Sequence, residues 1–452
     1  MRRIAFLLLA AASLLNVAAG ETHPRYGGTL RVMMQAAPST LELNTTGSSA
    51  DYWDSARILA MIADNLVNID IVGRTQPKLA LSWQVDLNGK RVQFTLRHGV
   101  KFHDGTPASS ADVAQILGER HKDWSVHASG DLLTIDSESP SSSLLAALAL
   151  PDSAIVKRGP NGLPIGTGAF RIAEFQPGKS LKLTANEESW AGRPFVDVIQ
   201  IELGRSLREQ SLAFELGRAD VVEAMPQPPA LNSGAQRIRT SLPVELLALV
   251  FPANSRAQDA RLREAVALAI DRKPIQSVLL KGAGEPAASI LPNWMTGYGA
   301  AFPAQANVQR ARVVLADSRQ PSLSLSYDPR DPQAQLIAER IALNAREAGI
   351  TLQVSLSGVP DINLLRIVIP SSYPATAMRE AARGLGLPQP LIHGSSVDDL
   401  YSAEHSLLDA HTVIPLIHLP VTSAAATRVH NWQPSRTGEW NLSDVWLEAD
   451  SR

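Results

Sequence analysis

Several side chains in this sequence are of types that could do chemistry. His103 and Asp104 are adjacent, as in a general acid–base or metal-binding pair. Glycine and proline follow them closely, so we interpret the pair as part of a turn. His405, His411 and His418 are spaced six and seven residues apart. That spacing places them on no common face of a helix or a strand, so the sequence predicts no metal site.

Two glycines and two arginines could form anion sites. Gly166 and Gly168 resemble a phosphate-binding loop, but a strand pattern follows them where the known phosphate loops have a helix. We therefore interpret them as a turn that enters a strand. Arg261 and Arg263 could bind an anion, but a solvated or ion-paired helix face is the more ordinary role. The sequence contains neither Gly-x-Ser-x-Gly nor His-Glu-x-x-His. We predict no catalytic residue, no cofactor and no enzymatic activity.

Composition limits the class of protein. The 452 residues suffice for two or three domains, and 45% hydrophobic with 19% charged residues is ordinary for a globular chain. Without the first twenty residues, 40 basic and 44 acidic residues remain. This slight negative charge favours neither nucleic acid nor an anionic membrane as partner. The absence of cysteine excludes disulfides, thiol catalysis, cysteine metal sites and a lipid-anchored cysteine.

The N-terminus has the pattern of a secretory signal. Arg2 and Arg3 precede an apolar run over residues 4–15, and small residues follow at 17–19. The alternative is a membrane anchor, but the run is shorter than the roughly 20 residues that a spanning helix needs. We predict that residues 1–20 are a cleaved signal peptide and that the protein is periplasmic.

The elements that would position side chains are clearest in residues 83–117. Two alternating apolar runs flank Asn88-Gly89, which predicts a hairpin whose two turn residues both have positive φ. Ser109 or Ser110 can then cap a helix. The apolar face of that helix consists of Val113, Ile116 and Leu117.

Three more helices and one long strand are expected. The helices begin at Asp54 or Ser55, at Ser206 and at Asp259. Their inward faces are Ile58, Met61, Ile62 and Leu66 for the first, Leu212, Leu216 and Ala219 for the second, and Leu262, Ala265, Val266, Ala269 and Ile270 for the third. The strand is the continuous apolar run over residues 246–251.

Two long segments resemble one protein family. Residues 77–120 contain Phe-Thr-Leu-Arg-x-Gly-Val-Lys-Phe-His-Asp-Gly-Thr-Pro, and residues 262–272 read Leu-Arg-Glu-Ala-Val-Ala-Leu-Ala-Ile-Asp-Arg. Both are similar to the extracellular solute-binding proteins of family 5, the peptide-, nickel- and haem-type receptors of ABC importers. The resemblance covers most of the chain and becomes weak after Ile350.

The resemblance implies an α/β protein with the two-lobed, periplasmic-binding-protein-like fold of type II, mixed sheets and a cleft between the lobes. We expect the chain to cross between the lobes near Asn254 and near Pro420. The expected parts are residues 1–20 as signal peptide, 21–46, 166–254 and 421–452 as the core of lobe 1, 47–165 as its accessory subdomain, and 255–420 as a shortened lobe 2.

The same resemblance implies an extracytoplasmic receptor that delivers a peptide-like or related solute to the permease and ATPase of an ABC importer by closure of the cleft. We expect a periplasmic monomer with no lipid anchor and no nucleic-acid partner. The positions that match ligand-contacting parts of the family are Leu41, Trp124, Trp294 and His418. Two alternatives stay open: a degenerate receptor that acts as a sensor or chaperone, and an extracytoplasmic hydrolase for which no nucleophile can be named.

One difference from the family generates a prediction. Peptide-binding members have a longer segment after the position of Ile350, and in some of them an Asp-Pro aspartate there pairs with the peptide's α-amino group. In this chain Asp361 is followed by isoleucine, and no Asp-Pro occurs between 350 and 413. A buried ammonium without a carboxylate partner costs several kcal/mol. We expect no tight binding of free-amine di- or tripeptides. Isothermal titration tests this, and sub-micromolar binding that N-acetylation abolishes would contradict it.

Overall fold

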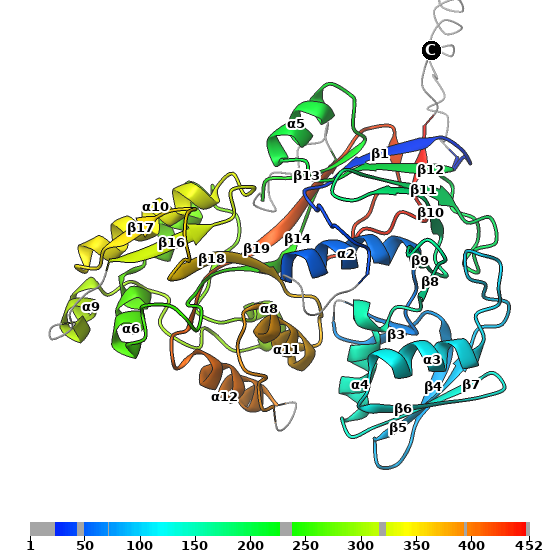
Figure 1. Cartoon of the computed structure of the whole chain (residues 1–452), viewed down its shortest axis with the longest axis horizontal. Helices are drawn as coiled ribbons and strands as arrows, with labels where there is room; N and C mark the ends of the chain where they lie inside the picture. The colour runs from blue at the N-terminus through cyan, green and yellow to red at the C-terminus, as the bar shows by residue number, and fades with distance from the viewer. Residues whose placement is uncertain are drawn as a thin grey trace, which may run out of the picture.

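One mixed sheet of eleven strands runs through the molecule (Figure 1). The computed structural model describes residues 23–42, 49–70, 72–226, 237–315, 322–392 and 396–448, so the predicted signal peptide lies outside the described residues. In spatial order the strands are β10 (Phe170–Gln176), β11 (Ser180–Ala185), β12 (Val198–Glu202), β1 (Thr29–Met33), β13 (Val221–Ala224), β19 (Val413–Ala425), β14 (Arg237–Val250), β18 (Ile362–Val368), β16 (Leu323–Tyr327) and β17 (Leu352–Val354), with β15 (Glu285–Pro286) beside β19. We call the β10–β13 side the first lobe, together with residues 49–165, which carry a smaller separate sheet, and the β18–β17 side the second lobe.

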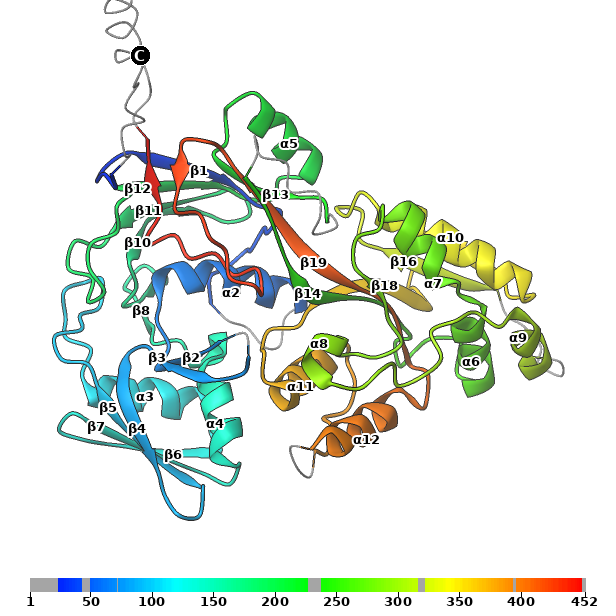
Figure 2. The same ribbon diagram turned by 180° about the vertical axis from the view of Figure 1, so that it is seen from behind.

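Strands β14 and β19 pass through both lobes, as Figure 2 shows from behind. The predicted apolar strand over 246–251 is the second-lobe half of β14. The two strands pair antiparallel from Arg237 opposite Ala425 to Val250 opposite Val413. The register is irregular around Pro243, which lies opposite Pro420. Proline has no N–H to donate, so the hydrogen bonding between β14 and β19 is interrupted where these two prolines face each other.

The hydrophobic core changes at this interruption. Leu419 packs in the core of the second lobe, whereas Ala425 packs in the core of the first lobe. Pro420 therefore lies where the chain passes from one core to the other. Asn254 lies in the loop beyond the end of β14, farther along the chain than this break.

Helices cover both faces of the sheet in each lobe. In the first lobe, α2 (Ser49–Ile62) and the C-terminal segment pack on one face, and α5 (Leu207–Glu215) packs on the other. In the second lobe, one face carries α6 (Ala260–Ala269), α9 (Val308–Leu315) and α10 (Ala334–Glu347). The other face carries α11 (Pro374–Gly384) and α12 (Val397–Leu408). The remaining short elements are α7 (Arg272–Pro274), η3 (Ile275–Leu279), α8 (Asn293–Thr296), and the strands β20 (Val429–His430) and β21 (Trp446–Leu447).

A second sheet lies apart from the first and carries its own core (Figure 1). Its order is β4 (Ala80–Val85), β5 (Arg91–Leu96), β7 (Leu132–Ser137) and β6 (Trp124–Ser129), covered by α3 (Ser110–Arg120) and α4 (Ser141–Leu148). Two small strand pairs adjoin it, β2 (Val67–Ile69) with β3 (Thr75–Pro77) and β8 (Lys157–Arg158) with β9 (Pro164–Ile165). The turn η1 (Pro151–Ser153) follows α4.

The predicted hairpin forms between β4 and β5, but its turn differs from the prediction. Gly89 has φ of 68°, whereas Asn88 is not among the described residues with positive φ. The Asp86 carboxylate accepts the N–H groups of Lys90 and Arg91, which holds the loop without a left-handed asparagine. The predicted cap of α3 is confirmed, because Ser109 forms a capping box with Asp112.

The helix predictions were correct in part. Ser206 and Asp259 cap α5 and α6 as predicted. Helix α2 begins at Ser49, so neither Asp54 nor Ser55 caps it. The predicted inward face of α5 is wrong for Leu212 and Leu216, which are 57% and 56% exposed, whereas Ala219, just beyond the helix, is buried as predicted.

A polar contact explains the orientation of α5. Gln210 is fully buried, and its amide exchanges hydrogen bonds with Glu223 on β13. The cost of leaving a buried carboxylate and a strand N–H unpaired turns Gln210 and Ala213 inward in place of the two leucines.

Gly166 and Gly168 enter β10 as predicted, directly against the end of α2. The N–H of Gly168 donates to the Ile62 carbonyl over 3.0 Å, and the N–H of His103 donates to the Gly166 carbonyl over 2.9 Å. The His103 ring hydrogen-bonds to the Gly168 carbonyl over 3.0 Å, which confirms its predicted place in a turn. A Cβ on Gly166 would lie 2.0 Å from the Ile62 carbonyl oxygen.

We expect Gly166→Ala to lower the free energy of unfolding by about 3 kcal/mol, because the end of α2 must move. The matched control is Gly118→Ala within α3, where a Cβ meets nothing within 4 Å. The control should keep or slightly raise stability, since alanine favours helix. Urea denaturation measures both variants. A Gly166→Ala protein as stable as the wild type would contradict this account of the glycine pair.

Candidate functional site

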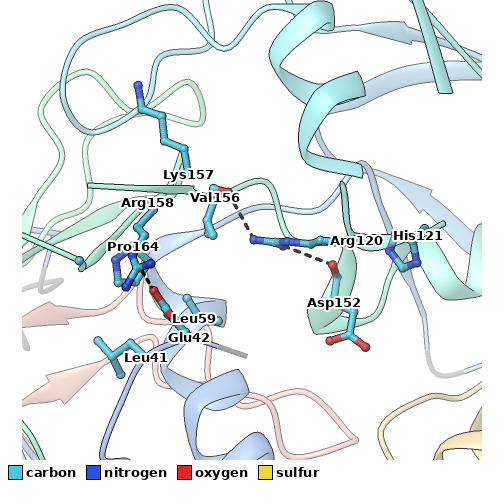
Figure 3. A pocket seen from close by; sticks show the side chains of 11 residues that line it. Leu41, Glu42, Leu59, Arg120, His121, Asp152, Val156, Lys157, Arg158 and Pro164 are labelled. Carbon is cyan, nitrogen blue, oxygen red and sulfur yellow. Dashed lines mark hydrogen bonds and ion pairs between the residues drawn. The ribbon is translucent and has the colours of Figure 1, made fainter. Parts of the chain in front are cut away.

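A cavity of about 390 Å³ lies in the first lobe, where α2, the end of α3, η1 and the β8–β9 pair meet the loop after β1 (Figure 3). A volume of this size suits a small organic molecule. The residues that line the cavity are Leu41, Glu42, Leu59, Arg120, His121, Asp152, Val156, Lys157, Arg158, Gly162 and Pro164.

Arg120 reaches into the cavity from the last turn of α3 (Figure 3). Its Nη1 donates to the carbonyl oxygens of Asp152, over 3.2 Å, and Ala154, over 2.6 Å. Its Nη2 donates to the carbonyl oxygen of Val156 over 3.3 Å. Burial lowers the pKa of Arg120, and nearby acidic groups offset only part of that shift. The guanidinium therefore holds the main chain around η1 at the edge of the cavity.

Asp152 connects the cavity to the second lobe. Its Oδ1 accepts the hydroxyl of Tyr52 on α2 over 2.8 Å, and its Oδ2 lies 3.6 Å from Nη1 of Arg383 on α11. The Arg383 guanidinium also lies over the Tyr52 ring, 4.8 Å from its centroid. Burial, followed by the Asp152 charge, raises the pKa of Tyr52. A second contact between the lobes joins the hydroxyls of Tyr373 and Ser142 over 3.0 Å.

Charged residues also lie deeper between the lobes. Arg57 on α2 pairs with Glu223 over 2.6 Å. Arg366 on β18 pairs with Asp331 over 2.6 Å and with Glu245 over 3.4 Å. Burial raises the pKa of Glu245 above its ordinary value, although the two arginines oppose that shift. Arg57 of the first lobe and Arg366 of the second lobe therefore both act on Glu245, which lies two residues from Pro243 in β14.

The four predicted site residues occupy three places. Leu41 is buried and lines the cavity. The Trp124 ring stacks on His121, 3.7 Å between centroids, and His121 lines the cavity. Trp294 lies on α8 and donates its indole N–H to the carbonyl of Pro243 over 2.8 Å. His418 is buried in β19, where its Nε2 hydrogen-bonds to the Ile290 carbonyl over 3.0 Å.

Leu41 thus lines the cavity, and Trp124 contacts it through the His121 ring. Trp294 lies at the break in β14, and His418 lies in the second lobe. All four stay predictions as ligand contacts. Sequence reasoning missed Arg120, Asp152, Tyr52 and Arg383. Only Arg120 had a local signal, since it ends a predicted helix.

Asp361, the acidic residue in the segment after Ile350 where the family resemblance becomes weak, already has hydrogen-bond partners within the protein. Asp361 accepts hydrogen bonds from the Arg256 side chain and main chain and from Ser324. Burial alone would raise the pKa of Asp361, but these hydrogen bonds hold it well below the usual range. Asp361 is therefore committed to joining β16 to the start of α6.

The described residues give no sign of a metal centre or a membrane span. Among them, no group of three His, Cys, Asp or Glu side chains comes close enough to hold a metal ion. His405 and His411 both contact the Phe302 ring, while His418 lies elsewhere in β19. Over the same described ranges, no helix has the length and apolar character to cross a bilayer.

The chain belongs to the bacterial extracellular solute-binding proteins of family 5, because the model of the middle part of that family matches residues 74–361. Among curated relatives, the probable di/tripeptide-binding protein 5 of Pseudomonas aeruginosa is 26% identical over 419 residues, which cover 78% of this chain and 76% of that protein.

Solved structures share the fold. A dipeptide-binding protein from Pseudoalteromonas sp. SM9913 in complex with Met-Leu has a TM-score of 0.79 at 17% identity, covering 93% of this chain and 100% of that one. NikA from Staphylococcus aureus in complex with Ni(L-His)2 has a TM-score of 0.78 at 16% identity, with the same coverage.

These comparisons confirm the predicted family and the predicted type II periplasmic-binding fold. The relatives are binding proteins, so this chain is a substrate-binding protein of the ABC-transporter class and not an enzyme. Proteins of this family are periplasmic or extracellular, bind peptides or small ligands, and work with components of ABC importers.

His418 should make stability depend on pH. Burial lowers its pKa from 6.5 to about 4. Between these values the unfolded chain binds more protons than the folded one, so the free energy of unfolding should fall as the pH drops from 6.5 to 4, by on the order of 3 kcal/mol. Urea midpoints at pH 7, 5.5 and 4 measure the effect. His418→Gln should be less stable at pH 7 and have a flatter profile, whereas exposed His127→Gln should keep the wild-type slope. A His418→Gln profile parallel to that of the wild type would contradict this role.

Proposed function

We propose that this protein is an extracytoplasmic receptor that binds a compact peptide-like or related solute and delivers it to an ABC importer by closing its two lobes. The observation that carries the proposal is the position of the cavity. Its lining residue Asp152 is one of the residues of the first lobe that Arg383 of the second lobe contacts. A solute in the cavity would therefore lie beside the surface that forms when the lobes meet.

The proposed closure uses the break in the two long strands. Among the described strands, β14 and β19 carry the sheet from one lobe to the other, and Pro243 lies opposite Pro420 where their hydrogen bonding is interrupted. Hinges are commonly a few residues that absorb a change in backbone angles. Trp294 holds the Pro243 carbonyl at this level, which supports a role in the hinge for this predicted site residue.

The remaining parts of the proposal follow the family. The partners would be the permease and ATPase of an importer, and the receptor would act as a periplasmic monomer after removal of residues 1–20, without a lipid anchor. The proposed division is residues 21–46, 166–254 and 421–452 for the core of lobe 1, 47–165 for its accessory subdomain and 255–420 for a shortened lobe 2. A sensor or chaperone on the same fold is the alternative, and it would keep solute binding without an importer.

Arg383 provides the test of closure. We expect Arg383→Met to open the lobes of the solute-free protein, because it removes the contact with Asp152 and Tyr52. Such a partly exposed contact is worth about 1 kcal/mol, roughly a fivefold shift toward the open form. Small-angle X-ray scattering should show a larger radius of gyration for Arg383→Met than for the wild type.

The matched control is Arg379→Met on the same helix, since Arg379 forms no ion pair with the first lobe in the part of the chain that the structure describes. The control should scatter like the wild type. Identical curves for all three proteins would contradict the proposed role of Arg383 in holding the lobes closed.

A further inference from the structure

We propose that the cavity holds its solute by an anionic group, a carboxylate or another oxyanion, bound to the guanidinium of Arg120. The proposal deepens the proposed receptor function and rests on it only for the biological role of the solute. Of the charged side chains that line the cavity, all except that of Arg120 have a partner of opposite charge among the described residues.

Two of the three cations that line the cavity have carboxylate partners. Arg158 pairs with Glu42 over 2.9 Å. Lys157 pairs with Asp104 over 2.7 Å, and its ammonium lies 4.6 Å from the centre of the Phe102 ring. In Figure 3 the Lys157 side chain extends away from Arg120. Neither cation is left to balance a charge on a solute.

The acidic residues of the lining are also balanced. Glu42 is the partner of Arg158. Both oxygens of Asp152 are occupied, one by the Tyr52 hydroxyl and the other by Arg383. The carboxylates of the lining therefore offer no unpaired negative charge to a cationic solute.

Arg120 is the exception. Within the described ranges it forms no ion pair, and its hydrogen bonds go only to main-chain carbonyl oxygens. A guanidinium has five N–H donors. Nη1 gives two bonds and Nη2 gives one, which leaves the Nε–H and one Nη2–H of Arg120 without a partner among the described residues. In an arginine side chain the Nε–H and one of the two Nη2–H groups lie on the same edge of the guanidinium plane, an arrangement that can bind a carboxylate with two parallel hydrogen bonds.

The surroundings favour an anion at this edge. Partial desolvation lowers the pKa of Arg120 although Asp152 and Glu119 act to raise it, which is the direction expected for a cation whose charge is incompletely balanced. The three carbonyl bonds fix the guanidinium in place, so that little side-chain entropy is lost on binding. The remaining lining, Leu41, Leu59, Val156 and Pro164, is apolar and suits the carbon skeleton of a small organic acid.

Sulfate is a suitable probe because it presents oxyanion oxygens without requiring knowledge of the natural solute. Thermal unfolding of the full protein would be followed as sodium sulfate is added, against sodium chloride at equal ionic strength. The wild type should show a saturable increase in Tm with sulfate beyond that with chloride. Arg120→Gln should weaken the apparent affinity about tenfold or more, the effect expected for a charged hydrogen bond.

The matched control is Lys122→Gln, an exposed cation near the end of the same helix that donates only to the Gly118 carbonyl. It should keep the wild-type response. Equal sulfate responses in the wild type and Arg120→Gln would overturn the proposal.

Because Arg120 also holds main-chain carbonyls, Arg120→Gln could fail to fold, and a second measurement on the wild type is independent of it. Crystals soaked in sodium selenate should give an anomalous peak within hydrogen-bond distance of the Arg120 Nε and Nη2. Selenate peaks at surface cations alone would overturn the proposal. If the sulfate or the selenate experiment fails, the proposed receptor function still stands with a neutral solute. If the Arg383→Met scattering experiment fails, the proposed anion site still stands.

Discussion

The antiparallel pairing of β14 with β19 is the constraint on which the rest of the structure depends. In the part of the chain that the structure describes, these two strands carry the large sheet from one lobe to the other, and both contribute to apolar cores in each lobe. Their ladder is interrupted where Pro243 faces Pro420. The lobes are thus joined by a pair of strands whose hydrogen bonding is interrupted at the two prolines, and relative motion of the lobes would be concentrated there.

The turn η1 plays a comparable part at the candidate site. From the cavity side, Arg120 binds the carbonyls of residues 152, 154 and 156. On its other side, the Asp152 side chain is bound by Tyr52 of α2 and by Arg383 of the second lobe. One short segment therefore connects the cavity wall with the contact between the lobes. This connection gives a physical route by which a solute and lobe closure would influence each other, without a longer chain of contacts.

Local signals in the sequence predicted local structure well. The hairpin of β4 and β5 and the caps Ser109, Ser206 and Asp259 depend on residues a few positions apart, and all of them form. The inward face of α5 was wrong because a distant carboxylate, Glu223, determines which side of the helix is buried. The cavity could not be predicted for the same reason. Tyr52 and Asp152 meet across 100 residues, and Arg383 joins them from another lobe, so no periodicity or motif connects them.

The central claim is that the protein binds one small solute without changing it. The most direct measurement is mass spectrometry under non-denaturing conditions, after the protein has been incubated with the low-molecular-weight fraction of periplasm and growth medium. The account predicts a single one-to-one adduct, small enough for a cavity of about 390 Å³, that denaturation releases unchanged. Chemical conversion of a compound in the mixture, or no adduct after incubation with any fraction, would contradict it.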